Sequence, residues 1–231
     1  MDDQRAEPAG APVGRRAILG LVALGAVGVL GGNWVQNRLG SLLGPLESRD
    51  PTGLIALLPL GQTFRFYSVT GSVPTRTAAS YRLDVSGLVG HTASYTLADL
   101  RAMPQTSFVR DFQCVTGWRV PGVHWAGVPL SAVLDRSAPT DRATGVRFHS
   151  FDGTYTESMS LAEARRSDVI VALQMLGAPV TPDHGGPVRI YAASMYGYKS
   201  TKWLSGIELT HGQVPGYWEH HGYSIDGSIR N

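Results

Sequence analysis

The sequence predicts an α+β domain built from short strands and a few short helices. Glycine and proline are abundant, with 28 and 14 among 231 residues, and this favours many turns over a helical bundle. Strand-like stretches outnumber helical ones, and no strand–helix–strand unit repeats along the chain. About 180 residues follow an N-terminal extension, enough for one domain with a substantial core. A net charge of only +2 argues against a nucleic-acid partner.

The first half of the expected domain contains two strands and one capped helix. Residues 81–85 alternate between apolar and polar side chains, as in a half-buried strand. Thr96 is the expected cap of a helix over residues 97–101, and Pro104 ends this helix. Residues 107–110 are the next expected strand, because they include aromatic and β-branched side chains and a Gly-Trp turn signal follows.

The second half continues with strands and two short helices. Pro129 suits the first position of a helix over residues 130–135, where its missing N–H costs nothing. Residues 160–163 have the spacing of a capping box, which predicts a helix to about Arg166. The continuous apolar run 169–176 is typical of a buried strand. Further strands are expected at residues 145–150, 155–159, 187–192 and 205–210.

The N-terminal extension has the pattern of an export or anchoring segment. Residues 1–16 end in two arginines and are the expected cytoplasmic tail. The uncharged stretch after the arginines reaches about 28 Å as a helix, close to the thickness of a bilayer core. We therefore expect residues 17–36 to be a hydrophobic transmembrane helix that anchors the chain, or a twin-arginine signal. After a linker at 37–62, the domain at 63–231 would lie outside the cytoplasm, membrane-anchored or exported to the periplasmic or cell-surface side.

Cys114 is the only cysteine, so the chain cannot form an intrachain disulfide. A lone cysteine is most often a small buried hydrophobe. Here it follows a strand and precedes Gly117, which leaves room for the thiol to face a bound group. A thiolate in that position could ligate a soft metal if an organic cofactor supplied the other ligands. It could instead be the nucleophile of a cysteine hydrolase, with His149 or His184 as the base.

A second informative stretch contains cations close to glycines and hydroxyl groups. Arg189, Lys199 and Lys202 lie near residues whose backbone N–H groups can be exposed. This combination suits a phosphate or another oxyanion, because arginine offers a bidentate contact and lysine a point charge. A basic strand end exposed to solvent would have a similar composition.

Three signatures give the chain a family likeness. The first reads CVTGW at 114–118 and VPGVHWAGVPL at 120–130. The second reads HGGPVR at 184–189 and YGYKSTKW at 196–203, and the third reads GYWE at 216–219. In this order they resemble the molybdopterin-binding domain of the sulfite oxidase family, and the likeness covers roughly residues 63–224. The resemblance implies a mixed-sheet, sulfite-oxidase-type fold.

The resemblance also implies a mononuclear molybdenum centre with Cys114 as its catalytic residue and only protein ligand. The pterin would supply two further sulfurs, and the reaction would be two-electron oxygen-atom transfer. By position in the motifs, the residues implied to contact the cofactor are Tyr67, Ser68, Ser150, His184, Arg189, Ser200, Thr201 and Lys202. Arg189 and Lys202 would hold the phosphate of the cofactor. The electrons would come from an external carrier, a membrane haem protein or a cytochrome.

Two departures from the family pattern bear on the substrate. Trp118 stands where sulfite oxidases carry an arginine, and residues 69–71 replace an Arg-Asn-His. Loss of two cations weakens a site for doubly charged sulfite, so a small S- or N-oxide is the expected substrate. The family's C-terminal immunoglobulin-like dimerisation domain is missing from a chain that ends at Asn231, so we expect a monomer. The alternative is a binding module that keeps the fold without turnover.

Overall fold

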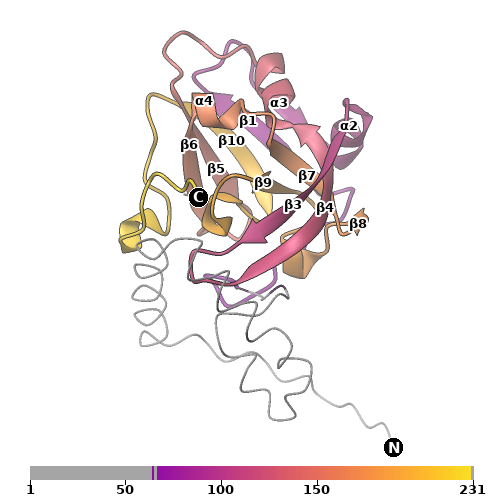
Figure 1. Cartoon of the computed structure of the whole chain (residues 1–231). Helices are drawn as coiled ribbons and strands as arrows, with labels where there is room; N and C mark the ends of the chain where they lie inside the picture. Colours follow the sequence, from indigo (N-terminus) through magenta and orange to yellow (C-terminus); the bar gives the residue numbers. More distant parts are fainter. Residues whose placement is uncertain (1–63, 65–66, 230–231) are drawn as a thin grey trace, which may run out of the picture.

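Two sheets form the domain in the computed structural model, which describes residues 64 and 67–229 (Figure 1). The first sheet has the order β2-β1-β10-β5-β6. Its strands are Ala93–Tyr95 (β2), Leu83–Gly87 (β1), Leu204–Thr210 (β10), Gly145–Ser150 (β5) and Thr156–Ser160 (β6). The second sheet has the order β3-β4-β7-β8, and β9 also pairs with β7. Its strands are Thr106–Gln113 (β3), Arg119–Pro129 (β4), Val169–Met175 (β7), Ala178–Pro179 (β8) and Arg189–Ala192 (β9).

The first sheet is mixed because of the place that β10 takes in it. β10 runs parallel to β1, with Ile207 opposite Val85, and antiparallel to β5, with Ile207 opposite Phe148. A parallel pair needs a long crossover, and here the crossover contains most of the domain. β10, which comes late in the sequence, therefore lies between β1 and β5, which come earlier. Mixed sheets with short helices confirm the predicted α+β class.

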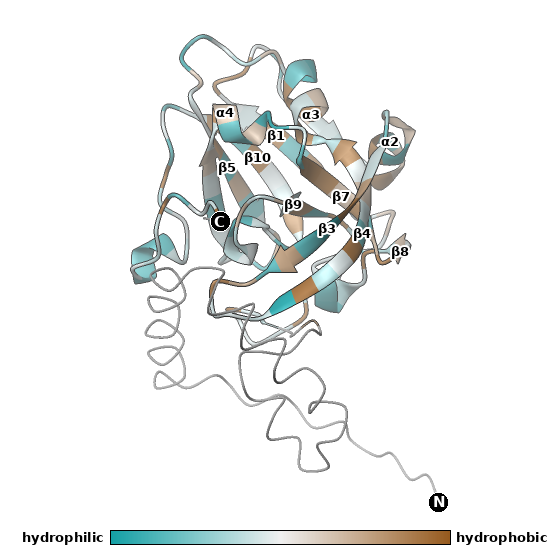
Figure 2. Cartoon of the chain, viewed as in Figure 1, coloured by the Kyte–Doolittle hydropathy of each residue, from teal (hydrophilic) through white to brown (hydrophobic). Residues whose placement is uncertain are grey.

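Apolar side chains of both sheets form the main core. Val85, Phe148 and Ile207 from the first sheet belong to one buried cluster with Val171 and Ile190 from the second. Hydrophobic and hydrophilic residues alternate along β4, as Figure 2 shows. β7 is instead buried along most of its length, as the continuous apolar run predicts.

The described residues form α-helices at Leu97–Ala102 (α2), Leu130–Arg136 (α3) and Leu161–Ala164 (α4). Thr96 and Ser160 cap α2 and α4 with complete capping boxes, which confirms both predicted caps. Pro129 is the N-cap of α3 and the last residue of β4, rather than the first helical residue. α4 ends before the predicted Arg166, because the Arg166 N–H bonds to the Glu163 carbonyl in a tighter turn.

The strands differ from the prediction at their ends and in number. β1 starts at Leu83 rather than Tyr81, whose hydroxyl donates to the buried Leu204 carbonyl at 2.8 Å. β7 ends before Leu176, because Leu176 and Gly177 have φ values of +56° and +77°. Such values belong to a two-residue hairpin turn, which here leads into β8. The sequence analysis missed β2 and β8, which are too short for a recognisable alternation. It also predicted no strand at β4, where Pro121, Gly122 and Gly127 interrupt the strand pattern.

The predicted tail at 1–16, hydrophobic segment at 17–36 and linker at 37–62 lie outside the described residues. Within the described part, no helix is both long and apolar enough to cross a bilayer.

Candidate functional site

Cys114 lies in the turn that joins β3 to β4. Its N–H donates to the Trp118 carbonyl at 2.9 Å, and the Gly117 N–H donates to the Cys114 carbonyl at 3.1 Å. Gly117 has a φ of +102°, which glycine adopts without strain, so the chain can reverse just after the thiol. The half-buried Sγ lies 3.1 Å from the Thr116 hydroxyl oxygen. The predicted position at a strand end is confirmed, and the thiol is not sealed inside the core.

Asp111 braces the two strands that carry this turn. Its carboxylate pairs with the Arg119 guanidinium and accepts from the Gly122 N–H at 2.8 Å. The Asp111 carbonyl accepts from the Tyr191 hydroxyl at 2.7 Å, which ties β3 to β9. Partial burial alone would raise the pKa of Asp111, but the bonds from Gly122 and Arg119 hold it below its usual value. The position of Cys114 is therefore set by charge-assisted contacts on the opposite strand.

The cysteine turn forms one wall of a pocket of about 280 Å³. Other walls come from the segment at 67–71, from the stretch between η2 (Pro182–His184) and β10, and from residues 217–223. The residues of the pocket that matter below are Tyr67, Ser68, Val69, Thr70, Gly71, Cys114, Trp118, Tyr155, His184, Arg189, Tyr198, Ser200, Lys202, Tyr217, Trp218 and Tyr223. Segments far apart in sequence thus meet around the thiol.

All but two of the predicted site residues line this pocket. Those that line it are Tyr67, Ser68, Cys114, His184, Arg189, Ser200 and Lys202. Ser150 does not line the pocket, but its hydroxyl accepts from the N–H of the pocket residue Asp152 at 3.2 Å. The Thr201 hydroxyl is buried and has no hydrogen-bond partner among the described residues. The contacts of these two residues with a cofactor remain predictions.

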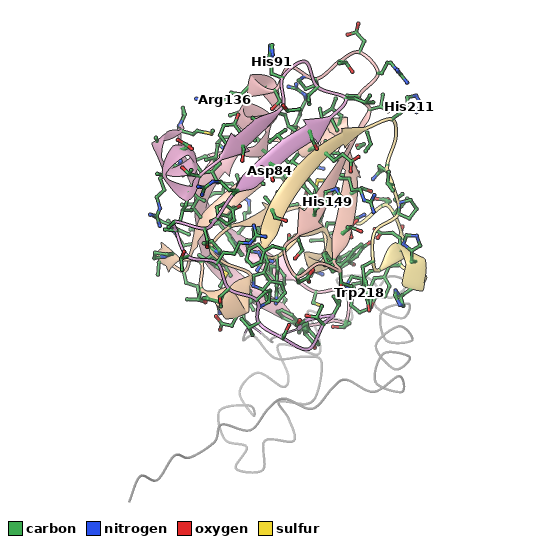
Figure 3. The ribbon with its side chains drawn as sticks, turned by 180° about the vertical axis from the view of Figure 1, so that it is seen from behind. Asp84, His91, Arg136, His149, His211 and Trp218 are labelled. Atoms are coloured by element: carbon green, nitrogen blue, oxygen red, sulfur yellow. The ribbon has the colours of Figure 1, made fainter. Side chains whose placement is uncertain are left out.

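The two histidines proposed as bases lie in different places. His149 on β5 pairs with Glu208 on β10 at 2.9 Å and does not line the pocket. Figure 3, seen from behind, labels His149 over the first sheet and Trp218 at the lower edge of the domain. His184 does line the pocket, and burial is the main reason that its pKa is lowered. In the described residues, no three His, Cys, Asp or Glu side chains gather as a metal site.

Arg189 brings an uncompensated charge to the pocket. Its guanidinium donates to the carbonyls of His184 at 2.6 Å and Ser200 at 3.0 Å, and it forms no ion pair within the described part of the chain. The side chain is only 2% exposed, and burial lowers its pKa to about 10. A buried cation held by neutral carbonyls favours an anionic partner, because the anion would supply the missing charge.

Lys202 extends this positive region. Its ammonium donates to the carbonyls of Tyr67 at 2.9 Å and Asp183 at 3.4 Å. Burial, followed by the nearby Arg189, lowers the pKa of Lys202 to about 7. Gly185 allows this arrangement, since a Cβ on it would lie 2.6 Å from the Lys202 Cβ. The segments that carry Arg189 and Lys202 therefore pack directly together beside the pocket.

Lys199 does not belong to this positive region, contrary to the sequence interpretation. Its ammonium is fully buried and bonds to the carboxylates of Glu157 at 2.7 Å and Glu219 at 2.5 Å. It also donates to the Ser158 carbonyl at 3.1 Å. The sequence could not reveal this, because both acids come from distant segments.

Several aromatic residues of the pocket were missed by the sequence analysis. Tyr155, Tyr198, Trp218 and Tyr223 form a wall on the side of the C-terminal segment. Burial raises the pKa of Tyr223 to about 12, and the neighbouring Cys114 adds to this shift. Trp218 and Tyr223 lie 5.0 Å apart between ring centroids. Tyr198 lies in the second signature and Trp218 in the third, but aromatic residues in such positions equally suit a core.

With this geometry, comparison with known proteins identifies the family. Residues 70–218, more than half of the chain, match the family model described as the oxidoreductase molybdopterin-binding domain. The chain therefore belongs to this sulfite-oxidase-like family of molybdopterin-dependent oxidoreductases. It is an enzyme of the molybdenum-cofactor type, and molybdopterin is its cofactor.

Individual relatives agree with this assignment. An uncharacterised oxidoreductase of Bacillus subtilis, YuiH, is 33% identical over 68% of this chain and 80% of its own length. The protein-methionine-sulfoxide reductase catalytic subunit MsrP of Ralstonia nicotianae is 27% identical over 88% of this chain and 71% of its own. The sulfane dehydrogenase SoxCD of Paracoccus pantotrophus shares the fold, with a TM-score of 0.56 and 19% identity over 62% of this chain and 41% of its own.

The pocket fits the cofactor of the family. A phosphate-bearing group needs cations that the protein has not already neutralised, and Arg189 meets this condition. A soft metal needs a thiolate ligand, and Cys114 presents a thiol at the pocket wall that can be deprotonated on binding.

Proposed function

We propose that the chain is a molybdopterin-dependent reductase of small neutral S- or N-oxides. One observation carries the proposal. A single pocket contains the Cys114 thiol and the cations Arg189 and Lys202, and it has uncharged residues at the two places where sulfite oxidases carry cationic ones. The name of the Ralstonia relative, a sulfoxide reductase, supports the same substrate class.

Arg189 and Lys202 would hold the phosphate of the cofactor. Ser200 also lines the pocket, and its carbonyl accepts from Arg189 at 3.0 Å. The buried Thr201 hydroxyl would rotate to donate once a partner is present. The Lys202 ammonium bonds to the Tyr67 carbonyl, and this supports the proposal that Tyr67 and Ser68 contact the pterin. His184, largely neutral at pH 7 because burial lowers its pKa, could donate or accept a hydrogen bond there.

Cys114 would be the protein ligand of molybdenum, and the cofactor would supply two-electron oxygen-atom transfer. Thr116 lies close enough to hydrogen-bond to the sulfur and so adjust its donor strength. Reduction of a sulfoxide consumes two electrons and two protons, and it yields a thioether and water. Tyr223 lines the pocket with Cys114, so its phenol, which is protonated at neutral pH, would be the proton donor.

The residues at the departures from the family pattern favour an uncharged substrate. Trp118 and residues 69–71 line the pocket and carry no charge. A doubly charged anion such as sulfite would lose its hydration there without gaining cationic partners. A neutral sulfoxide or N-oxide presents one polar oxygen on an apolar body, which suits a wall of tryptophan and tyrosine.

The electron carrier and location follow from the same assignment. No haem attachment motif or flavin fingerprint occurs in the sequence, so electrons would come from an external membrane haem protein or cytochrome. The arginine pair and uncharged segment before residue 37 support action outside the cytoplasm.

Metal analysis and a substrate screen test this function. The full chain, produced in a host that makes molybdopterin, should contain about one molybdenum per protein. With a reduced viologen dye it should reduce sulfoxides or N-oxides faster than it oxidises sulfite. Folded protein without molybdenum would disprove the cofactor role, and faster sulfite oxidation would disprove the substrate class. Thiol acylation of metal-free protein by an ester probe, with turnover, would instead favour a cysteine hydrolase.

A further inference from the structure

The C-terminal segment, residues 216–229, forms one wall of the pocket and is held mainly by its own short contacts. It supplies Tyr217, Trp218 and Tyr223 to the pocket. Backbone bonds tie its first part to β6, where the Tyr217 N–H donates to the Thr156 carbonyl at 2.9 Å. Its last part is tied near residues 194–196, where the Tyr196 N–H donates to the Gly227 carbonyl at 2.8 Å. Between these two ends, backbone bonds within the segment hold the wall residues, such as the Tyr223 N–H to the Trp218 carbonyl at 3.0 Å. Side-chain contacts with the rest of the domain add to them, such as the Tyr198 hydroxyl to the Ser224 carbonyl at 2.8 Å.

Lys199 makes contacts with both parts of this segment. Its ammonium bonds to Glu219 at 2.5 Å, one residue after Trp218. Its aliphatic stem packs against Gly227, where an added Cβ would lie 2.8 Å from the Lys199 Cε. The other Glu219 oxygen accepts from the Gly216 N–H at 3.0 Å, so the carboxylate also closes the turn that contains Tyr217 and Trp218.

The other side of Lys199 is fixed to the sheet. Glu157 on β6 accepts from the ammonium at 2.7 Å, and both side chains are fully buried. Because a buried charge is costly without its partners, the ammonium stays where the two carboxylates meet it. Tyr198 and Ser200, the neighbours of Lys199 in sequence, line the pocket. Lys199 thus connects the C-terminal wall and its own stretch of the pocket wall to β6, without lining the pocket itself.

We propose that Lys199 is a positioning residue, which uses Glu219 to hold Trp218 and Tyr223 against the pocket. Its link to turnover rests on the proposed function, but its effect on the C-terminal segment does not. Glu157 is a matched control within the same cluster. It bonds to the same ammonium from the sheet side and also contacts the Glu219 carboxyl group, but it does not close the turn at Gly216 as Glu219 does.

The test compares Glu219→Gln with Glu157→Gln in the full-length, molybdenum-loaded protein. Both changes remove one carboxylate and keep the side-chain shape. In Glu219→Gln, hydrogen exchange of residues 216–223 should accelerate about tenfold, the scale of a local opening that loses one such tie. In Glu157→Gln, exchange in that segment should stay within about twofold of the unchanged protein.

The kinetic arm measures sulfoxide reduction and metal content in the same preparations. Glu219→Gln should lower kcat/KM about tenfold, mainly through a higher KM, because a displaced wall holds the substrate less well. Molybdenum content should remain unchanged, which separates positioning from loss of the cofactor. Lys199→Arg should retain most of the kcat/KM, because a guanidinium can still reach both acids.

Each part of the proposal is contradicted by a different result. Equal exchange at residues 216–223 in both Gln variants would disprove the positioning role. Accelerated exchange in Glu219→Gln with unchanged KM would disprove the link to substrate binding. If the unchanged protein bound no molybdenum, the proposed function would fail while the exchange comparison still decided the role of Lys199. If Glu219→Gln did not fold, Lys199→Met combined with Glu219→Gln, which removes both partners, would be measured in the same way.

Discussion

At the scale of residues, the surroundings of Cys114 suit the proposed metal ligand better than a core thiol. The sulfur lies next to a pocket and the Thr116 hydroxyl, at the end of a braced hairpin. We expect Cys114→Ser to fold and to lose activity completely, because a hydroxyl is a poor substitute for thiolate on molybdenum. Sulfoxide reduction and circular dichroism measure the two properties.

Thr116→Val provides the matched control for the cysteine prediction. It removes the hydroxyl near the sulfur and keeps the ligand, so activity should fall by roughly tenfold, as for other residues that support a metal ligand. Strong residual activity in Cys114→Ser would indicate that the cysteine has only a structural role.

If Lys202 holds the cofactor phosphate, as we propose, cofactor retention should depend on pH. Burial and Arg189 lower its pKa to about 7, so the ammonium is charged below that pH and neutral above it. Affinity for the cofactor phosphate should therefore fall as pH rises through 7, by up to about tenfold per pH unit. Molybdenum content after gel filtration at a series of pH values measures this.

Two variants check that Lys202 is the titrating group. Lys202→Arg should flatten the pH profile, because a guanidinium stays charged. Lys202→Met should lower retention below pH 7 and approach the unchanged protein above it, where the lysine is already neutral. An unchanged profile in Lys202→Arg would assign the pH dependence to another group.

At the scale of elements, the contact between β4 and β7 depends on a glycine. A Cβ on Gly127 would collide with the Val171 carbonyl at the irregular point of the β4–β7 register. We expect Gly127→Ala to lower the free energy of unfolding by about 1–3 kcal/mol, the usual cost of overpacking. Urea denaturation measures it. Ser107→Ala on the exposed side of β3 should change stability by less than about 0.5 kcal/mol, and an equal effect of both changes would contradict the steric explanation.

Elements also differ in how far the sequence predicted them. The capping boxes at Thr96 and Ser160 act within one turn of helix, so residue types alone identify them. β2 and β8 have two or three residues each, and they are strands only because β1 and β7 lie alongside. Short strands of this kind carry no pattern that a sequence could reveal.

At the scale of the whole molecule, the N-terminal extension makes a separate prediction. If residues 15 and 16 belong to a twin-arginine signal, Arg15→Lys combined with Arg16→Lys should keep the protein inside the cell. Cell fractionation measures the location, and molybdenum content shows whether the retained protein is still loaded. Export of the double variant at the normal level would favour an uncleaved anchor inserted by another route.

The sequence by itself determined the α+β class, the helix caps, the family and the central place of Cys114. These features depend on residue types at short spacing or on motifs in a fixed order. Only the tertiary structure separated Lys199 from Lys202, and only it brought Tyr223 to the thiol. Both lysines lie in one short motif, but one meets two buried carboxylates and the other meets carbonyls beside a pocket. The role of a charged group depends on its partners, and here folding brings those partners from distant parts of the chain.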